Sequence, residues 1–467
     1  MDIKFGTGGF RGIIGDDFTK DTVCKIAQSL CNICLKNNFK KEVVIGYDHR
    51  FLSPETAKRM SEVFAANNFK VKILNSSSPT PTVMYLVEKY ELDIGVMITA
   101  SHNPSLFNGV KVFEKGGYDA DVNFTNTVEK ELNSVNNYAK LDYSDGIKQK
   151  LIEEIDGITP YNENILRFVK NINSSLKIGF DNLNGVAYIA LKDLFKKFGL
   201  NDVYVLNGER DPLFNGKMPN PIEANLDDLK NLVKEKHLDL GFATDSDGDR
   251  LGIVDEKGNY ISSNEILAAI YFFLVKYHHE TGDIVKNCAT SNLIDGIANY
   301  LGFKCHEVDV GFKNITHTMT EYDCLIGGES SGGLTIRNYI HGKDSIFAIM
   351  MFLMMVSEIN KPVSEIILEV KKMSGYKQFV IEDFISYKKE NEEKIIEYLK
   401  ENTPPFVLPL KRKEHYNRNF KYYFEDNQWI LIRLSGTEPV FRIFSEMNDP
   451  KMAHEDIKRL DEYVKGI

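Results

Sequence analysis

The stretch KEVVIGYDHR, residues 41–50, predicts a buried strand that ends in a Gly-aromatic-Asp turn. Helical sequence follows it, and a second apolar run, FKVKIL at 69–74, follows the helix. Strands that alternate with helices are typical of α/β units, in which the strands pair largely in parallel. We therefore expect an α/β fold in this part of the chain.

The same order of elements recurs twice further along the chain. LKIGFDNLNG at 176–185 is followed by a helical stretch and then by DVYVL at 202–206. A fainter copy runs from DIVKNCATS at 283–291 to KCHEV at 304–308. Each copy then gives one more strand that ends in a polar loop, and these stretches are 92–104, 238–250 and 323–333.

The polar loops fall at the same place in every copy. Ligands of open α/β sheets bind beyond the carboxyl ends of the strands. Three related units would therefore present three equivalent loops to one shared cleft. Chance similarity among short apolar strands is the alternative, and the matching position of the loops argues against it.

The last part of the chain does not match the repeat. The segment 401–418 contains prolines and many charges, and we expect it to be a loop with a solvated basic face. Residues 427–447 predict a strand, a turn and a strand, and a helix from about Ala453 follows. We interpret this part as a separate small domain.

The composition is that of an ordinary globular protein, with 467 residues, 43% hydrophobic and 27% charged. The net charge of −10 argues against a general affinity for nucleic acid or anionic membranes. The first twelve residues have no apolar stretch of signal-peptide length. The most apolar run, 346–356, is too short to span a bilayer and predicts a buried helix. We expect a cytoplasmic protein.

The cysteines and paired histidines do not form a metal or disulfide pattern. Six cysteines in so long a chain are not a disulfide framework. Cys31 and Cys34 form a CxxC, but they lie in a stretch with helical apolar spacing and lack a second CxxC or His pair. We interpret them as small apolar residues on a helix, and His278-His279 as a polar helix end.

The acidic stretch DSDGDR predicts a metal site. Asp245, Asp247 and Asp249 alternate, so one turn could bring three carboxylates together. Their mutual repulsion is costly unless a cation lies among them, and hard oxygen ligands suit Mg²⁺ or Mn²⁺. A calcium EF-hand does not fit, because the loop lacks the flanking helix pair and follows a strand. A solvated acidic turn is the alternative.

The stretch RLSGTEP predicts an anion site. Arg433 and Arg442 offer guanidinium forks, and Ser435, Gly436 and Thr437 offer hydroxyls and free backbone N–H groups in a turn. A plain β-turn is the alternative.

Two more polar loops carry candidate residues. In GGESSGG, Glu329 and Ser331 could hold neighbouring hydroxyls of a sugar, although a flexible surface loop explains the stretch equally well. In ITASHNPSLFNGVK, Ser101 lacks the GxSxG context of a hydrolase nucleophile. A serine beside a divalent cation could instead carry a phosphoryl group, with His102 and Lys111 handling protons or charge. By itself, the SHNP stretch would more often be a turn.

Together these stretches resemble the α-D-phosphohexomutase superfamily, in particular its bacterial phosphoglucomutase/phosphomannomutase branch. The resemblance covers nearly the whole chain, and the motifs come in the family's order. They are KFGTGGFRGIIG, TASHNP with NGVK, DSDGDR, VGFKNI, GESSGG and RLSGTEP.

The resemblance implies a heart-shaped protein of four domains, three of them related α/β domains and the last of an α+β type. The expected domains are 1–155 with the phosphoserine loop TASHNP, 156–260 with the metal loop DSDGDR, 261–372 with the sugar loop GESSGG, and 373–467 with the phosphate-binding loop RLSGTEP.

The resemblance also implies a role for each motif residue. Ser101 would be the phosphoserine, and its phosphate would share Mg²⁺ with the three aspartates, Asp245, Asp247 and Asp249. The expected transfer-site residues are Arg11, His102, Lys111, Arg250 and Lys313. Glu329 and Ser331 would bind sugar hydroxyls. The phosphate that is not transferred would be held by Arg433, Ser435, Gly436, Thr437 and Arg442.

The reaction implied is the interconversion of hexose 1-phosphate and hexose 6-phosphate through a 1,6-bisphosphate that turns around between two transfers. Glucose 1,6-bisphosphate would be the intermediate and activator. We expect glucose to be preferred and mannose to be accepted. The only partners implied are small hexose phosphates, on a monomer or weak homodimer.

The chain departs from the family pattern in places. Leu434 stands where many members have proline, Ser330 replaces a common Glu or Met, and Gly333 stands where some branches have histidine. The stretch NYIHGKDS diverges from the usual continuation of the sugar loop, which leaves the roles of His341 and Lys343 open.

Three alternatives remain at this point. Phosphoglucosamine mutase is the main rival within the family. A metal-dependent sugar phosphatase that uses Ser101 would release inorganic phosphate. A non-catalytic phosphosugar-binding protein is disfavoured because Ser101 and all three aspartates are present.

Overall fold

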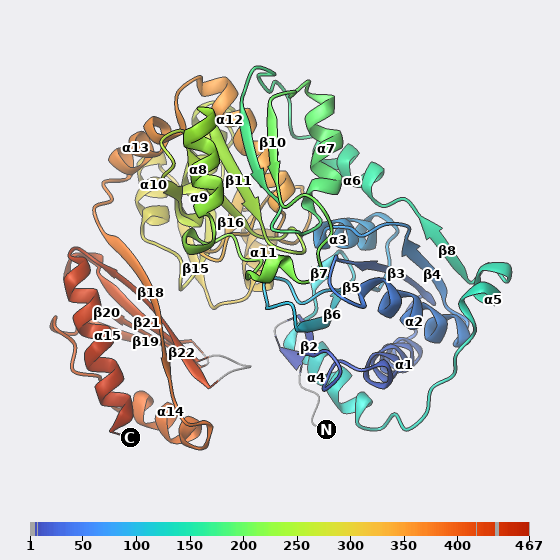
Figure 1. Cartoon of the computed structure of the whole chain (residues 1–467). Helices are drawn as coiled ribbons and strands as arrows, with labels where there is room; N and C mark the ends of the chain where they lie inside the picture. The colour runs from blue at the N-terminus through green and yellow to red at the C-terminus, as the bar shows by residue number, and fades with distance from the viewer. Residues whose placement is uncertain (1–4, 7, 417, 435–438, 467) are drawn as a thin grey trace.

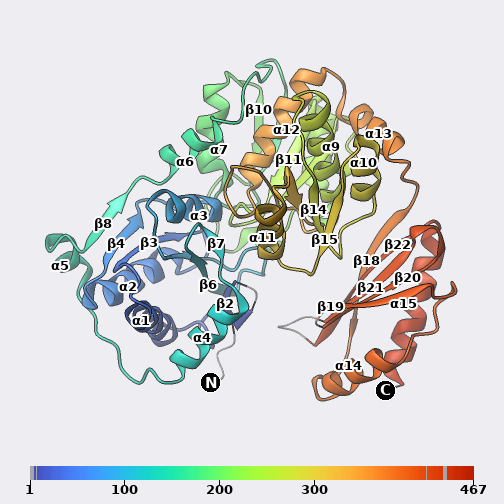
Figure 2. The same ribbon diagram turned by 180° about the vertical axis from the view of Figure 1, so that it is seen from behind.

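The computed structural model describes residues 5–6, 8–416, 418–434 and 439–466. Over these residues the chain forms four β-sheets in four lobes that lie along an arc (Figure 1). The view from behind shows the first and fourth lobes at the two ends of the arc (Figure 2). The expected fold class, three related α/β domains and a C-terminal α+β domain, is confirmed. The boundaries predicted between the domains stay predictions.

The first three sheets share one connectivity, which explains the sequence repeat. In each, a central strand pairs in parallel with the next two strands of the chain, one on either side, and a fourth strand then pairs antiparallel with the third. In that order the strands are β3 (Glu42–Tyr47), β4 (Lys70–Leu74), β5 (Ile94–Ile98) and β6 (Phe107–Glu114); β9 (Ile178–Asp181), β10 (Val203–Leu206), β11 (Leu240–Thr244) and β12 (Leu251–Asp255); and β14 (Ile284–Asn287), β15 (Cys305–Val308), β16 (Ile326–Gly328) and β17 (Leu334–Ile336).

Short strands extend the first two sheets. In the first sheet, β2 pairs with β6, β1 with β2, β7 with β6 and β8 with β4, and in the second β13 pairs with β12. Their bounds are β1 (Phe5–Gly6), β2 (Gly9–Ile13), β7 (Tyr118–Asp119), β8 (Ile152–Ile155) and β13 (Tyr260–Ile261).

Helices cover both faces of the first sheet. The apolar faces of α1, α2 and α4 share one core with it, and α3 packs in a second core on β3 and β5. Cys31 and Cys34 are buried on α1, as the helical interpretation predicted. The helices of this lobe are α1 (Lys20–Lys36), α2 (Ser53–Ala66), α3 (Thr80–Lys89), α4 (Val122–Leu132) and α5 (Tyr143–Lys148).

One apolar helix joins the second and third lobes. α12 (Ser345–Ile359) contacts α7, α9, β12 and β17. Its residues from 345 to 356 are all buried, and those from 346 to 356 belong to a core that both lobes share. The prediction of a buried helix at 346–356 is therefore confirmed. The other helices here are α6 (Ile158–Ile165), α7 (Ala187–Lys197), α8 (Asp227–Lys236), α9 (Ser263–Lys276), α10 (Leu293–Leu301), α11 (Phe312–Tyr322) and α13 (Val363–Ser374).

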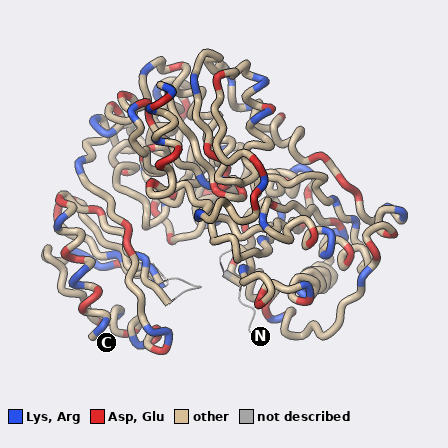
Figure 3. The backbone as a smooth tube through the Cα atoms, in the orientation of Figure 1, with Lys and Arg blue, Asp and Glu red and all other residues tan. Residues whose placement is uncertain are grey.

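In the described part of the chain, no single helix has the length and apolar character that a membrane crossing needs. The pair α12 and α13 meets that test only jointly, across a bend of 89°. Lysine and arginine are interspersed with aspartate and glutamate over all four lobes (Figure 3).

The fourth sheet is antiparallel throughout, in the order β18-β22-β21-β20-β19, and α14 and α15 pack against it. The expectation of a loop over 401–418 is wrong in part, because 412–416 pair with β20 as an edge strand. An edge strand often carries charged side chains, because one of its edges is unpaired and open to solvent. Its sequence can therefore resemble that of a loop. The elements are β18 (Phe379–Ser386), α14 (Glu392–Glu401), β19 (Arg412–Tyr416), β20 (Asn419–Tyr423), β21 (Trp429–Leu434), β22 (Val440–Met447) and α15 (Pro450–Lys465).

A buried carboxylate fastens the fourth lobe to the third. Glu446 on β22 is fully buried, and it accepts hydrogen bonds from the N–H of Asn292 at 2.9 Å and from the hydroxyl of Tyr376 at 2.7 Å. The Ser291 hydroxyl and the Trp429 indole N–H also donate to it. Since Asn292 caps α10, Glu446 supplies from another lobe the negative charge that a helix N-terminus favours.

We expect Glu446→Ala to detach this junction. The variant leaves several buried donors without an acceptor, at about 1–3 kcal/mol each, so the loss should reach about 3 kcal/mol. The melting temperature should fall by at least about 5 °C in a thermal scan. Glu425→Ala is the control, because Glu425 is exposed and pairs with the exposed Lys411, and it should leave the melting temperature within about 1 °C. Equal melting temperatures for the two variants would contradict this interpretation.

Candidate active site

Ser101 lies in a tight turn three residues after the end of β5. Its side chain is buried, and its backbone has φ +51°, which is uncommon for a residue other than glycine. The Thr99 hydroxyl accepts a hydrogen bond from the Ser101 N–H at 2.9 Å. The Ser101 hydroxyl donates a hydrogen bond to Asp245 Oδ2 at 2.9 Å. The turn therefore directs Oγ from the first lobe to residues 245–250 of the second lobe, which we call the acidic loop.

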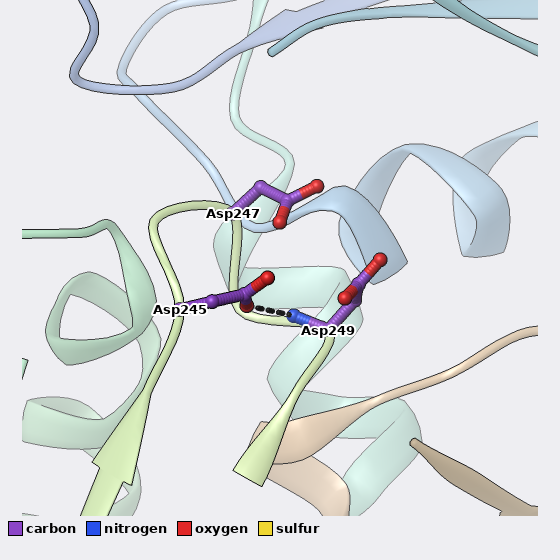
Figure 4. Close-up of side chains that lie close together, drawn as sticks. All are labelled: Asp245, Asp247 and Asp249. Atoms are coloured by element: carbon purple, nitrogen blue, oxygen red, sulfur yellow. Dashed lines mark hydrogen bonds between the residues drawn. The ribbon is translucent and has the colours of Figure 1, made fainter. Parts of the chain in front are cut away.

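The three aspartates lie in the turn between β11 and β12, and all of them are buried (Figure 4). One carboxylate oxygen from each lies within 4.8 Å of the others. Asp245 Oδ1 accepts the backbone N–H groups of Asp249 at 3.0 Å and Arg250 at 3.1 Å, which closes the turn. Burial and the other two carboxylates raise the pKa of Asp245.

These residues fit a divalent cation. Oδ1 of Asp247 and Oδ1 of Asp249 are buried and have no hydrogen-bond partner among the residues that the structure describes. An unpaired buried carboxylate oxygen is costly, and a cation would repay that cost. Three hard carboxylate oxygens are the donor set that Mg²⁺ or Mn²⁺ prefers. The acidic turn is therefore not a solvated one, and the observation favours the predicted metal site.

All three α/β lobes hold the acidic loop in place. From the first lobe, Thr80 donates its N–H to Asp247 O at 2.8 Å and its hydroxyl to Asp247 Oδ2 at 2.7 Å. From the second, the Val186 N–H donates to Ser246 O at 3.1 Å. From the third, the Ser345 hydroxyl donates to Gly248 O at 2.7 Å. The geometry of the carboxylates therefore depends on the packing of the lobes.

Lys111 brings a positive charge into the same site. It lies on β6, next to the Ser101 turn, and its Nζ is 2.7 Å from Asp247 Oδ2 and 2.8 Å from Asp249 Oδ2. Burial opposes the charge on Lys111, but the two carboxylates outweigh burial and raise its pKa. Burial likewise opposes the charge on Asp249, but the charges of Lys111 and Lys343 outweigh burial and lower the pKa of that carboxyl. The site is thus built of charges that offset each other.

Two arginines and a histidine complete this side of the site. His102 Nδ1 is 3.4 Å from Ser101 Oγ. Burial, and then the charges of Arg250 and Arg11, lower the pKa of His102 well below its ordinary value, so its ring is neutral near pH 7. Arg11 donates to Asn103 Oδ1 at 2.8 Å, and Arg250 Nε lies 3.8 Å from Asp249 Oδ1.

Glu329 directly follows β16, at the edge of the third sheet where its parallel strands have their carboxyl ends. It accepts hydrogen bonds from Asn287 at 3.0 Å and from the Ser331 hydroxyl at 2.5 Å. Lys343 Nζ lies 3.4 Å from Glu329 Oε1 and 3.7 Å from Asp249 Oδ2. Lys343 therefore bridges the sugar loop and the acidic loop.

The sequence analysis left the role of Lys343 open and did not single out Asn287. In the structure Gly333 leaves room for Lys343, because a Cβ at Gly333 would lie 2.1 Å from Lys343 Cδ. His341 is placed differently. Its Nδ1 lies 3.0 Å from Gly116 O, and its ring stacks on Tyr118 at 4.1 Å between centroids, so it joins the first and third lobes.

Lys313 lies in the first turn of α11, after Gly311 with its φ of +116°. Its positive charge acts on Glu114 in the first lobe, where burial raises the pKa of the carboxyl and Lys313 opposes that effect. The helix of Lys313, α11, packs against β7 of the first lobe.

The predicted anion site is described only in part. Arg433 on β21 and Arg442 on β22 are paired residues of adjacent strands. Burial lowers the pKa of Arg433, and the negative charge of Glu329 in the third lobe opposes that effect. The remaining predicted residues of this loop lie outside the described part of the chain; they are Ser435, Gly436 and Thr437.

Comparison with known proteins finds the same architecture. The chain matches family models described as phosphoglucomutase/phosphomannomutase, alpha/beta/alpha domain I at residues 2–139, domain II at 158–258 and domain III at 262–373.

Two curated relatives match along their whole length. A phosphoglucomutase/phosphomannomutase of Thermococcus kodakarensis is 30% identical and covers 99% of both chains. A phosphoglucosamine mutase of Clostridium tetani is 28% identical and covers all of both chains.

Two solved structures share the fold. A putative phosphomannomutase from Thermus thermophilus has a TM-score of 0.85 and 26% identity, over 100% of this chain and 99% of that one. The open form of a Paramecium phosphoglucomutase, parafusin, has a TM-score of 0.83 and 20% identity, over 99% of this chain and 94% of that one.

We expect Asp247→Asn to weaken the binding of a divalent cation. The variant removes one charged ligand, so the affinity for Mn²⁺ should fall by at least about 100-fold, as seen by titration followed by electron paramagnetic resonance. Asp227→Asn, an exposed aspartate of the same lobe, is the control and should bind Mn²⁺ as the unaltered protein does. Equal affinities for the two variants would exclude Asp247 as a ligand.

Proposed function

Because the chain belongs to the phosphoglucomutase/phosphomannomutase family, whose members are isomerases of sugar phosphates, we propose that it moves a phosphoryl group between carbons 1 and 6 of a hexose through a phosphorylated Ser101. One observation carries the proposal: the buried Ser101 hydroxyl donates at 2.9 Å to a carboxylate of the acidic loop. A serine so placed can receive a phosphoryl group where three lobes converge.

The transfer needs positive charge around the phosphoryl group in the transition state. Arg11, Arg250 and Lys111 supply it from two lobes, and Lys343 adds a charge from the third. A Mg²⁺ ion held by Asp245, Asp247 and Asp249 with an oxygen of the Ser101 phosphate would add Lewis-acid stabilisation of the same charge.

Each phosphoryl transfer breaks one P–O bond, forms another and moves one proton. The bond between phosphorus and Ser101 Oγ breaks as a bond to a sugar hydroxyl forms, and Oγ takes up the proton that the hydroxyl loses. His102, with a neutral ring 3.4 Å from Oγ, is placed to carry that proton. The opposite phosphate of the bisphosphate then returns to Ser101, which regenerates the phosphoserine. Glucose 1,6-bisphosphate is the corresponding intermediate and activator.

Substrate recognition is divided between the third and fourth lobes. Glu329 and Ser331 hold ring hydroxyls, and the pair is already ordered by Asn287 and Lys343. Arg433 and Arg442, together with the loop 435–437, hold the phosphate that is not transferred. This phosphate site must accept either end of the sugar, so it recognises phosphate and little else.

We propose glucose as the preferred sugar, with mannose accepted. In this proposal Glu329 and Ser331 bind the hydroxyls of carbons 3 and 4, and no motif residue is assigned to carbon 2. The similarity to phosphoglucosamine mutases over the full chain makes a 2-amino sugar the second candidate.

We expect Ser101→Ala to abolish the activity. Intact-mass measurement of active protein should show one phosphate, and the variant should lack it. Mutase activity should fall by at least about 1000-fold, as for removal of other covalent carriers. Ser105→Ala, in the same loop, is the control and should keep both the phosphate and the activity. Full activity in Ser101→Ala would refute the phosphoserine mechanism.

We expect the sugar loop to discriminate at carbon 4 more than at carbon 2. Between glucose and mannose 1-phosphates, kcat/KM should differ by about 10–100-fold. Galactose 1-phosphate should be far poorer, because its epimeric hydroxyl leaves a buried partner unpaired. Glucosamine 1-phosphate completes the series.

The matched variants of this experiment are Glu329→Ala and Glu321→Ala. The first should lower kcat/KM for glucose 1-phosphate by about 100-fold, the effect of a lost charged hydrogen bond. The second removes an exposed glutamate of α11 and should change nothing. Equal turnover of galactose and glucose 1-phosphates would show that the sugar loop is assigned wrongly.

A further inference from the structure

Arg50, at the end of the stretch 41–50, is a fully buried arginine with no place in the reaction proposed above. Its guanidinium donates hydrogen bonds to four backbone carbonyls of the Ser101 loop. Nη1 donates to Pro104 O at 2.9 Å and to Phe107 O at 3.0 Å, and Nη2 donates to Asn103 O at 2.6 Å and to Ser101 O. One rigid side chain thus holds the loop from Ser101 to Phe107.

The charge of Arg50 is neutralised within the same turn. Nε lies 3.4 Å from Asp48 Oδ2, and both side chains are inaccessible to solvent. Asp48 Oδ1 accepts the Ser53 hydroxyl at 2.7 Å and the Arg50 N–H at 2.9 Å. The centroid of the Phe214 ring, from the second lobe, lies 4.9 Å from the guanidinium carbon. Displacing either group would leave a buried charge without its partner, which disfavours other geometries.

Ser246 connects this pair to the acidic loop. It lies between Asp245 and Asp247, and its hydroxyl is 2.6 Å from Ser101 O and 3.3 Å from Asp48 Oδ2. The Ser101 carbonyl therefore contacts Arg50 from its own lobe and Ser246 from the second lobe. Asp48, Arg50, Ser246 and this carbonyl form a closed cluster, which we call the carbonyl brace.

The carbonyl brace holds the backbone of Ser101, from which the hydroxyl projects. Ser101 has φ +51°, a conformation that serine rarely adopts without support from its surroundings. Loss of the contacts with Arg50 and Ser246 would free this backbone segment to shift, and a shift of the segment would move Oγ away from Asp245. An error of about 1 Å in the position of a reacting atom can lower a rate by about 100-fold.

We propose that Arg50 is a positioning residue for phosphoryl transfer: it fixes the Ser101 carbonyl, and through Ser246 it keeps the Ser101 hydroxyl in register with the acidic loop. This inference rests on the function proposed for Ser101. Arginine is required because its planar guanidinium can donate to four acceptors at once. The ammonium of lysine carries all its donors on one nitrogen and cannot reach all four.

The test compares Arg50→Lys with Arg59→Lys. Arg59 is an arginine of α2 in the same lobe, pairs with Glu62 at 3.3 Å, and is partly exposed. In Arg50→Lys, kcat with glucose 1-phosphate should fall by about 100-fold while KM changes by less than about twofold. The contacts that bind sugar and phosphate lie in other lobes and stay intact. Arg59→Lys should keep both constants.

Single-turnover measurements separate positioning from stability. The rate at which phosphorylated protein loses its phosphate to glucose 1-phosphate, followed by intact mass, should fall as kcat does. A residue that only supports the fold would lower the melting temperature or the folded fraction and leave the rate per folded molecule unchanged. An unchanged rate in folded Arg50→Lys overturns the inference.

Ser246→Ala gives a second route to the same answer. It removes one hydroxyl of the carbonyl brace and leaves the buried charges paired, so it should fold even if Arg50→Lys does not. We expect kcat to fall by about 10-fold at constant KM, and an unchanged kcat overturns the inference. Ser101→Ala distinguishes the two levels. Full activity in that variant refutes the phosphoserine itself, whereas an inactive Ser101→Ala beside fully active Arg50→Lys and Ser246→Ala refutes only the carbonyl brace.

Discussion

The repulsion among three buried carboxylates is the constraint on which the rest of this structure depends. Asp245, Asp247 and Asp249 approach one another inside the protein, which is unfavourable unless positive charge and hydrogen-bond donors surround them. Lys111 comes from the first lobe, Lys343 from the third, and backbone donors from the turn itself. The site can therefore form only where the lobes meet, and its charges in turn help to fix how they meet.

The same convergence gives the Ser101 turn the fixed geometry that the proposed phosphoryl transfer needs. A serine hydroxyl on a free loop would have no fixed direction, whereas Ser101 is held by Thr99, Asp245 and the carbonyl brace. In the proposed mechanism, the third and fourth lobes add substrate recognition. Their junction at Glu446 is a set of buried hydrogen bonds to a single carboxylate, which fastens the two lobes to each other.

Much of this could be predicted from the sequence because the information is local. Apolar strands, glycine-rich turns and helical spacing recur in register, so the three α/β units were predicted and confirmed. The edge strand at 412–416 was missed, since an edge strand can be charged on its open side. Lys343 was left open because no neighbouring motif accounts for it, although Gly333 marks the space it occupies.

The sequence by itself determined the repeated α/β units and the chemical type of each polar loop. Both can be recognised within short stretches, because they depend on the residue types present and on their spacing along the chain. Only the tertiary structure decided which of these groups meet. Arg50 and Ser101 are 51 residues apart, and Ser101 and Asp245 are 144 apart, yet each pair is in contact. Contacts of that kind follow from sheet order and from the packing of whole lobes, which no short stretch of sequence encodes.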